Sequence, residues 1–185
     1  LFIEFHGSES AVAEQVATVE SLALDNGGSG FRYAHRPEDR SRLWKARHSC
    51  YHANLAMHPG WSSMGTDACV PISALVECIT ETEAAIRESG LYAPIVGHVG
   101  DGNFHLGIIY DDNDPAARGK AEALAEDVAL RAIRLGGTCT GEHGVGLHRI
   151  GQIEIEHGEA IDLMRDIKRA LDPLGIMNPG KMLRM

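Results

Sequence analysis

The sequence predicts an α+β fold, in which helices cover one face of a largely antiparallel sheet. Apolar residues recur at helical spacing in several segments of the 185-residue chain, and short strand-like runs alternate with these segments. Two of the runs, residues 93–98 and 103–110, are separated only by a short turn, which indicates a direct antiparallel hairpin. Mixed order of this kind is typical of the α+β class.

Each expected element has a local signal in the sequence. We expect helices at residues 8–26, from Pro37 into the fifties, at 73–90 with Ser73 as the cap, at 114–135 behind Asp114 and Pro115, and from about Glu159 to 171. We expect strands at residues 1–5, 31–34, 65–70, 93–98 and 103–110, and loops at residues 57–64 and 138–146. The predicted architecture is a ferredoxin-like antiparallel sheet with helices packed on one face, plus a C-terminal helical segment.

The composition narrows the class of protein. The formal net charge of −9 argues against a nucleic-acid partner, because binding to phosphates requires clustered Lys and Arg. No apolar run approaches the roughly 18 residues that a membrane span needs. The four cysteines have no CxxC spacing, so we expect reduced thiols and a cytoplasmic protein. The chain begins at Leu1 inside an apolar run, from which we expect a C-terminal piece of a longer protein.

The predicted hairpin carries two histidines that can share a metal ion. The segment Gly100-Asp101-Gly102 strongly favours a tight turn between the two apolar runs. If residues 99–102 form the turn, His98 faces Asn103 and Val96 faces His105. Paired residues share a face of a sheet, as do residues two apart in a strand, so His98, Asn103 and His105 project together. The alternative is a hairpin with two solvent-facing histidines.

A second cluster, TGEHGVG at residues 140–146, supports the metal interpretation. Glycines flank Glu142 and His143, so the backbone can approach a ligand closely. Two histidines and a carboxylate form a common open site for a catalytic divalent ion. We therefore expect His98, His105 and Glu142 to bind zinc, manganese or iron(II), and His143 could be a fourth ligand.

At these residues the sequence resembles a known family. The stretches VGHVGDGNFH (96–105), GEHGVG (141–146) and LDPLGIMNPGKML (171–183) resemble the C-terminal domain of FAD-linked oxidases of the vanillyl-alcohol oxidase type. LWKARH (43–48) and TDACVPIS (66–73) look most like the D-lactate dehydrogenase (cytochrome) and glycolate oxidase branch. The resemblance covers residues 1–185 as one substrate and metal domain, and it implies that an N-terminal FAD-binding domain is absent from this chain.

The resemblance also implies a role for individual residues. His98, His105 and Glu142 match the metal ligands. His143 matches the base near the flavin that takes the substrate hydroxyl proton, and Arg47 matches the partner of the substrate carboxylate. Asn103 matches a substrate-positioning residue, and Asn178 matches a stretch that returns toward the flavin. Arg47 could instead be a surface charge, and Asn178 could belong only to a helix-terminating turn. The hydroxyglutarate enzymes carry a lysine near the position of Gly65, so its absence here argues against a second substrate carboxylate.

These features together predict an FAD-dependent dehydrogenase of D-2-hydroxyacids such as D-lactate, with glycolate and D-2-hydroxyglutarate as alternative substrates. A divalent ion that binds the carboxylate and hydroxyl would lower the pKa of the hydroxyl, and imidazole can accept the proton. The expected partners are the acid, the chain's own FAD domain, and a cytochrome, quinone or electron-transfer flavoprotein. A homodimer and a peripheral location at the inner membrane are compatible with this prediction. The rival interpretations are a metal-binding or dimerising module without chemistry and a metallohydrolase.

Overall fold

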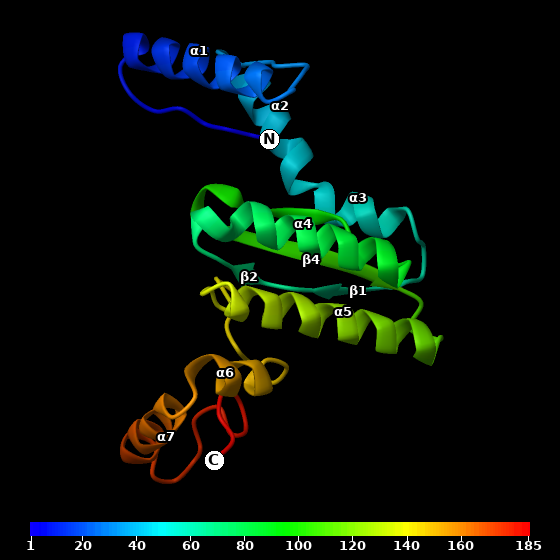
Figure 1. Cartoon of the computed structure of the whole chain (residues 1–185), viewed down its shortest axis with the longest axis vertical. Coiled ribbons are helices and arrows are strands. Elements are labelled where there is room, and N and C mark those ends of the chain that lie inside the picture. Colours follow the sequence, from blue (N-terminus) through cyan, green and yellow to red (C-terminus); the bar gives the residue numbers. More distant parts are fainter. The chain divides into compact units, whose positions relative to one another are not determined.

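The computed structural model describes residues 1–185, and the chain forms two compact units (Figure 1). The first unit comprises residues 1–53 and the second residues 54–185. Each unit has its own arrangement of elements, and the two are described in turn.

The first unit is helical. Helix α1 (Glu9–Asp25) begins behind Ser8, whose hydroxyl accepts a hydrogen bond from the Ala11 amide at 3.3 Å. Helix α2 (Pro37–His48) starts with a proline in its first turn, and α3 (Cys50–Ala56) follows after a break at Ser49. The predicted helix at residues 8–26 is confirmed, and the helix predicted from Pro37 is present as these two pieces.

The strands predicted at residues 1–5 and 31–34 are wrong. Neither segment belongs to the sheet or forms an isolated bridge. An extended segment becomes a strand only when its amide and carbonyl groups find a partner. Apolar composition alone does not supply that partner.

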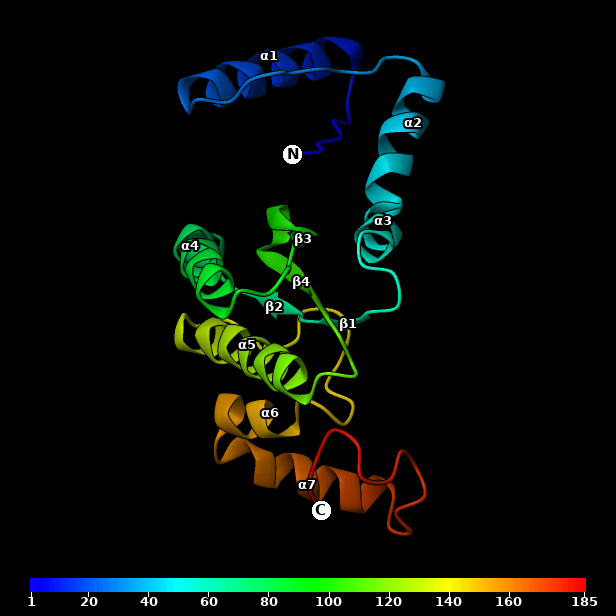
Figure 2. The ribbon, with the colours of Figure 1, turned by 90° about the vertical axis from the view of Figure 1, so that its right-hand side faces the viewer.

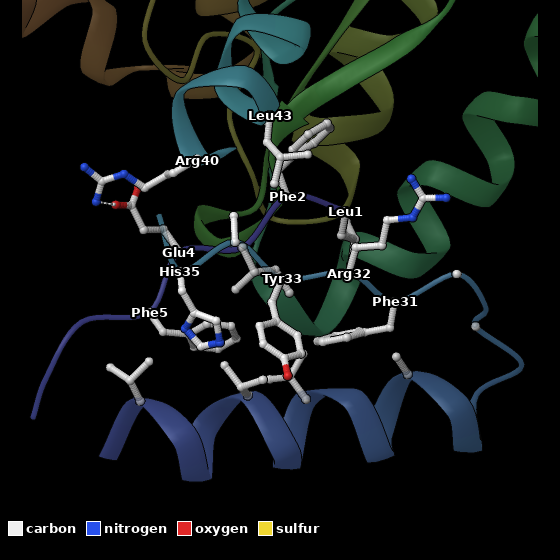
Figure 3. A pocket seen from close by; sticks show the side chains of 18 of the residues that line it. Leu1, Phe2, Glu4, Phe5, Phe31, Arg32, Tyr33, His35, Arg40 and Leu43 are labelled. Atoms are coloured by element: carbon white, nitrogen blue, oxygen red, sulfur yellow. Dashed lines mark hydrogen bonds and ion pairs between the residues drawn. The ribbon is translucent and has the colours of Figure 1, made fainter. Parts of the chain in front are cut away.

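The apolar stripe of α1 faces a pocket of about 670 Å³ within the first unit. Figure 3 shows Phe5, Phe31 and Tyr33 pointing from the flanking segments toward the helix, and Arg40 paired with Glu4 at 3.3 Å. The stripe itself is made of valines and an alanine, namely Val12, Val16, Val19 and Ala23. No residue of α1 or α2 is buried, so this face lines a cavity and not a packed core.

The second unit contains an antiparallel sheet built around one long strand, β4 (Asn103–Tyr110). Strands β1 (Ser62–Gly65) and β2 (Ala68–Cys69) pair along one side of β4, and β3 (Ile95–His98) pairs along the other. β1 and β2 pair with β4 in the same register, although residues 66–67 between them belong to neither strand. This register places Asp67 opposite His105. The predicted strand at 65–70 is therefore two short strands in one line.

Helices α4 (Ile72–Ser89) and α5 (Pro115–Arg134) cover one face of this sheet (Figure 2). Alternate residues of β4 point toward them and form the core with apolar side chains from both helices; the β4 members are Phe104, Leu106, Ile108 and Tyr110. The predicted α+β class with helices on one face is confirmed. None of the helices combines the length and apolar character that crossing a bilayer requires.

Helices α6 (Ile150–His157) and α7 (Ala160–Leu171) form a smaller cluster with Cys139 and Leu183. Helix α7 was predicted from the sequence, but α6 was not. The spacing of Ile150, Ile153 and Ile155 mixes helical and strand periods, so no single pattern stands out there.

Two further boundaries differ from the prediction. Helix α4 begins at Ile72 behind Pro71, so Ser73 lies inside its first turn and is not the cap. The loop predicted at 57–64 is shorter, because β1 already begins at Ser62. The sequence of β1 has little strand preference, and its pairing with β4 decides its conformation.

Candidate metal centre

The β3–β4 hairpin positions the two predicted histidine ligands. His98 pairs with Asn103 and Val96 pairs with His105, which is the register that the turn chemistry predicted. The turn is a short 3-10 helix (Val99–Asp101) that Gly102 ends in the left-handed conformation, with a φ of 76°. A Cβ on Gly102 would lie 2.0 Å from the carbonyl oxygen of Val70, so only glycine fits. The hairpin is therefore packed closely against β2 at its turn.

Glu142 joins the two histidines on the face of the sheet opposite α4 and α5. The ligand atoms of His98, His105 and Glu142 all lie within 4.8 Å of one another. Glu142 Oε1 is 2.9 Å from His105 Nε2 and 3.9 Å from His98 Nε2. Two imidazoles and one carboxylate at this spacing match the donor set of an open divalent-metal site. Their role as ligands stays a prediction, but the structure brings all three together.

The backbone determines which nitrogen of His105 is free. His105 Nδ1 lies 3.1 Å from the carbonyl oxygen of Thr66. A carbonyl can only accept, so Nδ1 carries the proton and donates it to Thr66. Nε2 lies 2.9 Å from the Glu142 carboxylate, which also can only accept, and it is the nitrogen left for a metal ion to take in place of a proton. This is the arrangement in which an imidazole ligates a metal ion, with its other nitrogen fixed by a hydrogen bond.

Close packing brings the Gly-rich loop to the hairpin. Thr138 forms an isolated bridge with Cys69, and the Gly141 amide donates to the carbonyl oxygen of Asp67 at 3.2 Å. A Cβ on Gly141 would lie 2.4 Å from Asn103 Nδ2. Glycine at this position lets the loop backbone pack against the hairpin, whereas the predicted close approach to a ligand stays a prediction.

Asp67 is a site residue that the sequence reasoning missed. Its side chain is 0% exposed and accepts four hydrogen bonds, from Asn103 Nδ2, Thr140 Oγ1 and the amides of Glu142 and His143, at 2.8 to 3.0 Å. Burial by itself raises the pKa of Asp67, but these hydrogen bonds outweigh it and lower the pKa to about 2. The signal that could have found Asp67 is its place in the 65–70 run, which pairs with the strand that carries His105.

A second set of possible ligands, Asp67 with His105 and His143, is less suited to a metal ion. The oxygens of Asp67 already accept hydrogen bonds from four donors, and the His105 nitrogen that lies 3.5 Å from Asp67, Nδ1, already donates to Thr66. The set of His98, His105 and Glu142 leaves these bonds intact. The geometry therefore favours the predicted ligands.

His143 lies beside the cluster. Its ring stacks on that of His105 with centroids 4.9 Å apart and planes at 2°, and its Nε2 is 3.6 Å from Glu142 Oε1. The side chain is exposed, so a substrate can reach it. Both predicted roles, base and fourth ligand, remain open for His143.

Asn103 offers an acceptor that the protein leaves unused. The residue is 6% exposed, and its Nδ2 donates to Asp67 Oδ1 and to the carbonyl oxygen of Ala68. Its Oδ1 is buried without a hydrogen-bond partner. Buried acceptors without partners are rare and often mark functional positions. Asn103 pairs with His98 and lies two residues before His105 in β4, so this orphaned acceptor belongs to the same part of the sheet as the predicted ligands.

The remaining predicted site residues lie elsewhere in the chain. Arg47 belongs to α2 in the first unit, whereas the cluster belongs to the second, so its pairing with a substrate carboxylate stays a prediction. Asn178 is exposed in the C-terminal segment with a φ of 47°, and its carbonyl accepts from the Lys181 amide at 3.2 Å. The predicted turn at Asn178 is present, and its contact with a flavin stays a prediction.

Comparison with known proteins places these features in a family. A family model described as FAD linked oxidases, C-terminal domain, matches residues 1–182. A probable mitochondrial D-lactate dehydrogenase of Danio rerio is 47% identical over 186 residues, which cover 100% of this chain and 37% of the relative. The mitochondrial D-lactate dehydrogenase [cytochrome] of Arabidopsis thaliana is 42% identical, with 99% of this chain and 32% of the relative covered.

More distant matches agree with this placement. The glycolate oxidase subunit GlcD of Escherichia coli K12 is 31% identical, with 98% of this chain and 36% of the relative covered. The solved structure of 4-ethylphenol oxidase from Gulosibacter chungangensis, in complex with isoeugenol, has the same fold at a TM-score of 0.64 and 19% identity, and the match covers 96% of this chain and 37% of that one. The chain thus spans about a third of the length of the curated relatives it matches. It belongs to the family of FAD-linked oxidase C-terminal domains.

Proposed function

We propose that this chain is the substrate- and metal-binding part of a flavin-dependent D-2-hydroxyacid dehydrogenase, which oxidises a D-lactate-like acid to the 2-oxoacid. The observation that carries the proposal is the cluster of His98, His105 and Glu142 on the face of the sheet opposite α4 and α5, next to an exposed imidazole. Membership of the FAD-linked oxidase family supports the redox class, and the names of the relatives support a small hydroxyacid as the substrate.

Different residues of this chain would bind the metal ion, bind the substrate and accept its proton. His98, His105 and Glu142 would hold a zinc, manganese or iron(II) ion, which when bound supplies a Lewis acid that lowers the pKa of the substrate hydroxyl. His143 accepts the hydroxyl proton, since the side chain is exposed next to the cluster and a neutral imidazole is a common general base. Asn103 Oδ1 accepts a hydrogen bond from the substrate, and Arg47 binds its carboxylate.

In the overall reaction the substrate loses one proton and one hydride. The O–H bond gives its proton to His143, and the C2–H bond breaks with its electron pair leaving as hydride, so that a C=O bond forms. FAD, when bound, supplies the acceptor for that hydride. We propose that a further domain of the same protein binds most of the FAD, and that His143 and Asn178 of this chain lie near it.

The sheet beside the cluster favours a substrate with one carboxylate. Gly65 pairs directly with Gly107, which lies two residues beyond His105 on the same face. Neither position carries a charged side chain, so no cation there would bind a second carboxylate. D-lactate and glycolate fit this surface better than D-2-hydroxyglutarate.

Other parts of the proposal concern the whole protein. A cytochrome, quinone or electron-transfer flavoprotein would take the electrons onward, and a homodimer is compatible with the chain. Two of the relatives are mitochondrial by name, so the predicted cytoplasmic or peripheral inner-membrane location stays a prediction for this protein.

Metal binding is the first test. The chain should bind one equivalent of Co²⁺ or Zn²⁺ in a titration, and His105→Ala should lose this binding. His52→Ala, which removes an exposed histidine of α3 outside the cluster, should leave it unchanged. Equal binding by the wild type and His105→Ala would show that these are not the ligands.

Flavin reduction is the second test. In the flavin-containing full-length protein, D-lactate should bleach the oxidised flavin absorbance. If no small D-2-hydroxyacid bleaches the flavin, the dehydrogenase proposal fails. Hydrolytic turnover by the chain without flavin would instead favour a metallohydrolase, and metal binding with no turnover in the full-length protein would favour a binding module.

A further inference from the structure

Asp67 is a buried carboxylate that connects segments far apart in the sequence. Its hydrogen-bond donors are a side chain of β4, the hydroxyl of Thr140, and the amides of Glu142 and His143. The loop from Thr140 to Gly144 contains no helix or strand, so no backbone ladder holds it in place. The Gly141 amide donates to the backbone carbonyl of Asp67, and the carboxylate of the same residue holds Thr140, Glu142 and His143 beside the hairpin that carries the other two predicted ligands.

The hydrogen bonds leave Asp67 little capacity to bind an ion itself. Asp67 Oδ2 accepts from Thr140 Oγ1 and from the two loop amides, and Oδ1 accepts from Asn103 Nδ2. Each oxygen of an ionised carboxylate has about two lone-pair sites. Three donors saturate Oδ2, one donor takes a site of Oδ1, and His105 Nδ1, which already donates to Thr66, lies 3.5 Å from Oδ1. Its effect on a ligand must then pass through the residues that it holds.

We propose that Asp67 is the positioning residue of this metal centre: it holds the loop that presents Glu142 and His143 against the hairpin and orients the amide of Asn103. The proposal rests on the proposed metal-binding function of the cluster. It assigns a role to a residue that touches neither the ion nor the substrate.

The orientation of Asn103 follows from the same carboxylate. Both hydrogens of Nδ2 are used, one by Asp67 Oδ1 and one by the Ala68 carbonyl oxygen. A flipped amide would turn Oδ1 toward the carboxylate and the Ala68 carbonyl, where three acceptors would face one another. Asp67 thus selects the one amide orientation that leaves Asn103 Oδ1 free to accept a hydrogen bond from a ligand.

Asp67 also lies next to His105. Asp67 Oδ1 is 3.5 Å from His105 Nδ1, and both residues lie on the face of the sheet opposite α4 and α5. A carboxylate at this distance attracts the Nδ1–H group, so it helps to hold the His105 ring with Nε2 toward Glu142. The same residue therefore acts on the loop and on both site residues of β4.

The test compares Asp67→Asn with a matched control, Asp172→Asn, in the full chain. Asp172 is also a buried carboxylate, 7% exposed, that accepts hydrogen bonds from two loop amides, those of Ile176 and Met177. None of its partners belongs to the metal cluster. Asp172 also pairs with Lys168. Both substitutions remove one buried carboxylate and keep the side-chain shape, so Asp172→Asn controls for the general cost of losing such a group.

Two measurements separate positioning from a merely structural role. In the metal-free chain, Asp67→Asn should speed hydrogen exchange at the Glu142 and His143 amides, whereas Asp172→Asn should do so only at Ile176 and Met177. In a Co²⁺ titration, Asp67→Asn should weaken binding by about 10- to 100-fold and change the visible d–d bands at saturation. Asp172→Asn should leave the affinity within about twofold and the bands unchanged.

The outcomes distinguish this proposal from the proposed function. Unchanged exchange at Glu142 and His143 together with unchanged Co²⁺ affinity in Asp67→Asn would overturn the positioning role. An equal loss of affinity in Asp172→Asn would also overturn it, since the effect would then be general. If the wild type binds no Co²⁺, the metal function fails, and the exchange measurement still decides whether Asp67 holds the loop. If Asp67→Asn does not fold, Thr140→Val, which removes one donor to the carboxylate, should show the same changes in smaller degree.

Discussion

The substitution Gly97→Ala tests the strand packing that brings His98 and His105 together. Gly97 lies in β3 opposite Phe104 of β4. An added Cβ would lie 2.4 Å from the carbonyl oxygen of Asn103, 2.5 Å from Phe104 Cα and 2.8 Å from Phe104 Cβ. Two of these atoms are backbone of the central strand, and Phe104 is fully buried, so none can move aside alone.

The magnitude follows from these contacts. Overpacking a tight core costs about 1–3 kcal/mol, and a clash with backbone belongs at the upper end, so we expect a loss of about 3 kcal/mol in the free energy of unfolding. For a protein of this size that is a fall of roughly 6–12 °C in melting temperature. His98 follows Gly97 directly, so Co²⁺ binding should weaken as well.

Thermal and urea unfolding followed by circular dichroism measure this change. Gly119→Ala is the matched control, because Gly119 is exposed in α5 with nothing near the added Cβ. Alanine is the better helix former, so this control should gain about 0.5–1 kcal/mol. If Gly97→Ala were as stable as the wild type, the close approach of β3 and β4 would be refuted.

Three further predictions concern acid stability, thiol reactivity and the core. The lowered pKa of Asp67, about 2 against an ordinary 3.8, is worth about 2.5 kcal/mol of stability. This contribution to the free energy of unfolding is present above about pH 4 and is lost as the pH falls toward 2. Urea unfolding across this pH range should show the loss in the wild type. An equal loss in Asp67→Asn would contradict the assignment to Asp67. Burial and a hydrogen bond with Glu156 raise the pKa of Cys139 to about 12, so iodoacetamide at pH 8 should label this thiol only in urea, as mass spectrometry can check. Phe104→Ala should cost about 3–5 kcal/mol in urea unfolding, and a loss below about 1 kcal/mol would speak against a fully packed ring.

Local patterns predicted much of the second unit. The helix at Pro115–Arg134 follows from its cap, where Asp114 Oδ1 accepts from the Ala116 amide at 2.9 Å, and from its apolar stripe. The hairpin register follows from the turn at Gly100 to Gly102 and the two-residue period of strands. These features depend on neighbours within a few residues, so the sequence contains the information directly.

Pairing between distant segments could not be predicted in the same way. Residues 1–5 and 31–34 have strand composition without a strand partner, whereas Ser62–Gly65 has little strand preference and pairs with β4. A strand is stabilised by hydrogen bonds to another segment, and local composition does not say whether that segment is present.

The sequence by itself determined the metal-site candidates, His98, His105 and Glu142, and the family to which the chain belongs. Only the tertiary structure decided how these side chains are held: which nitrogen of His105 is free, which way the amide of Asn103 points, and that Asp67 connects the loop to the hairpin. The reason is physical. Residue type sets what a group can donate or accept, but its actual partners come from segments up to 76 positions away, and folding alone brings these together.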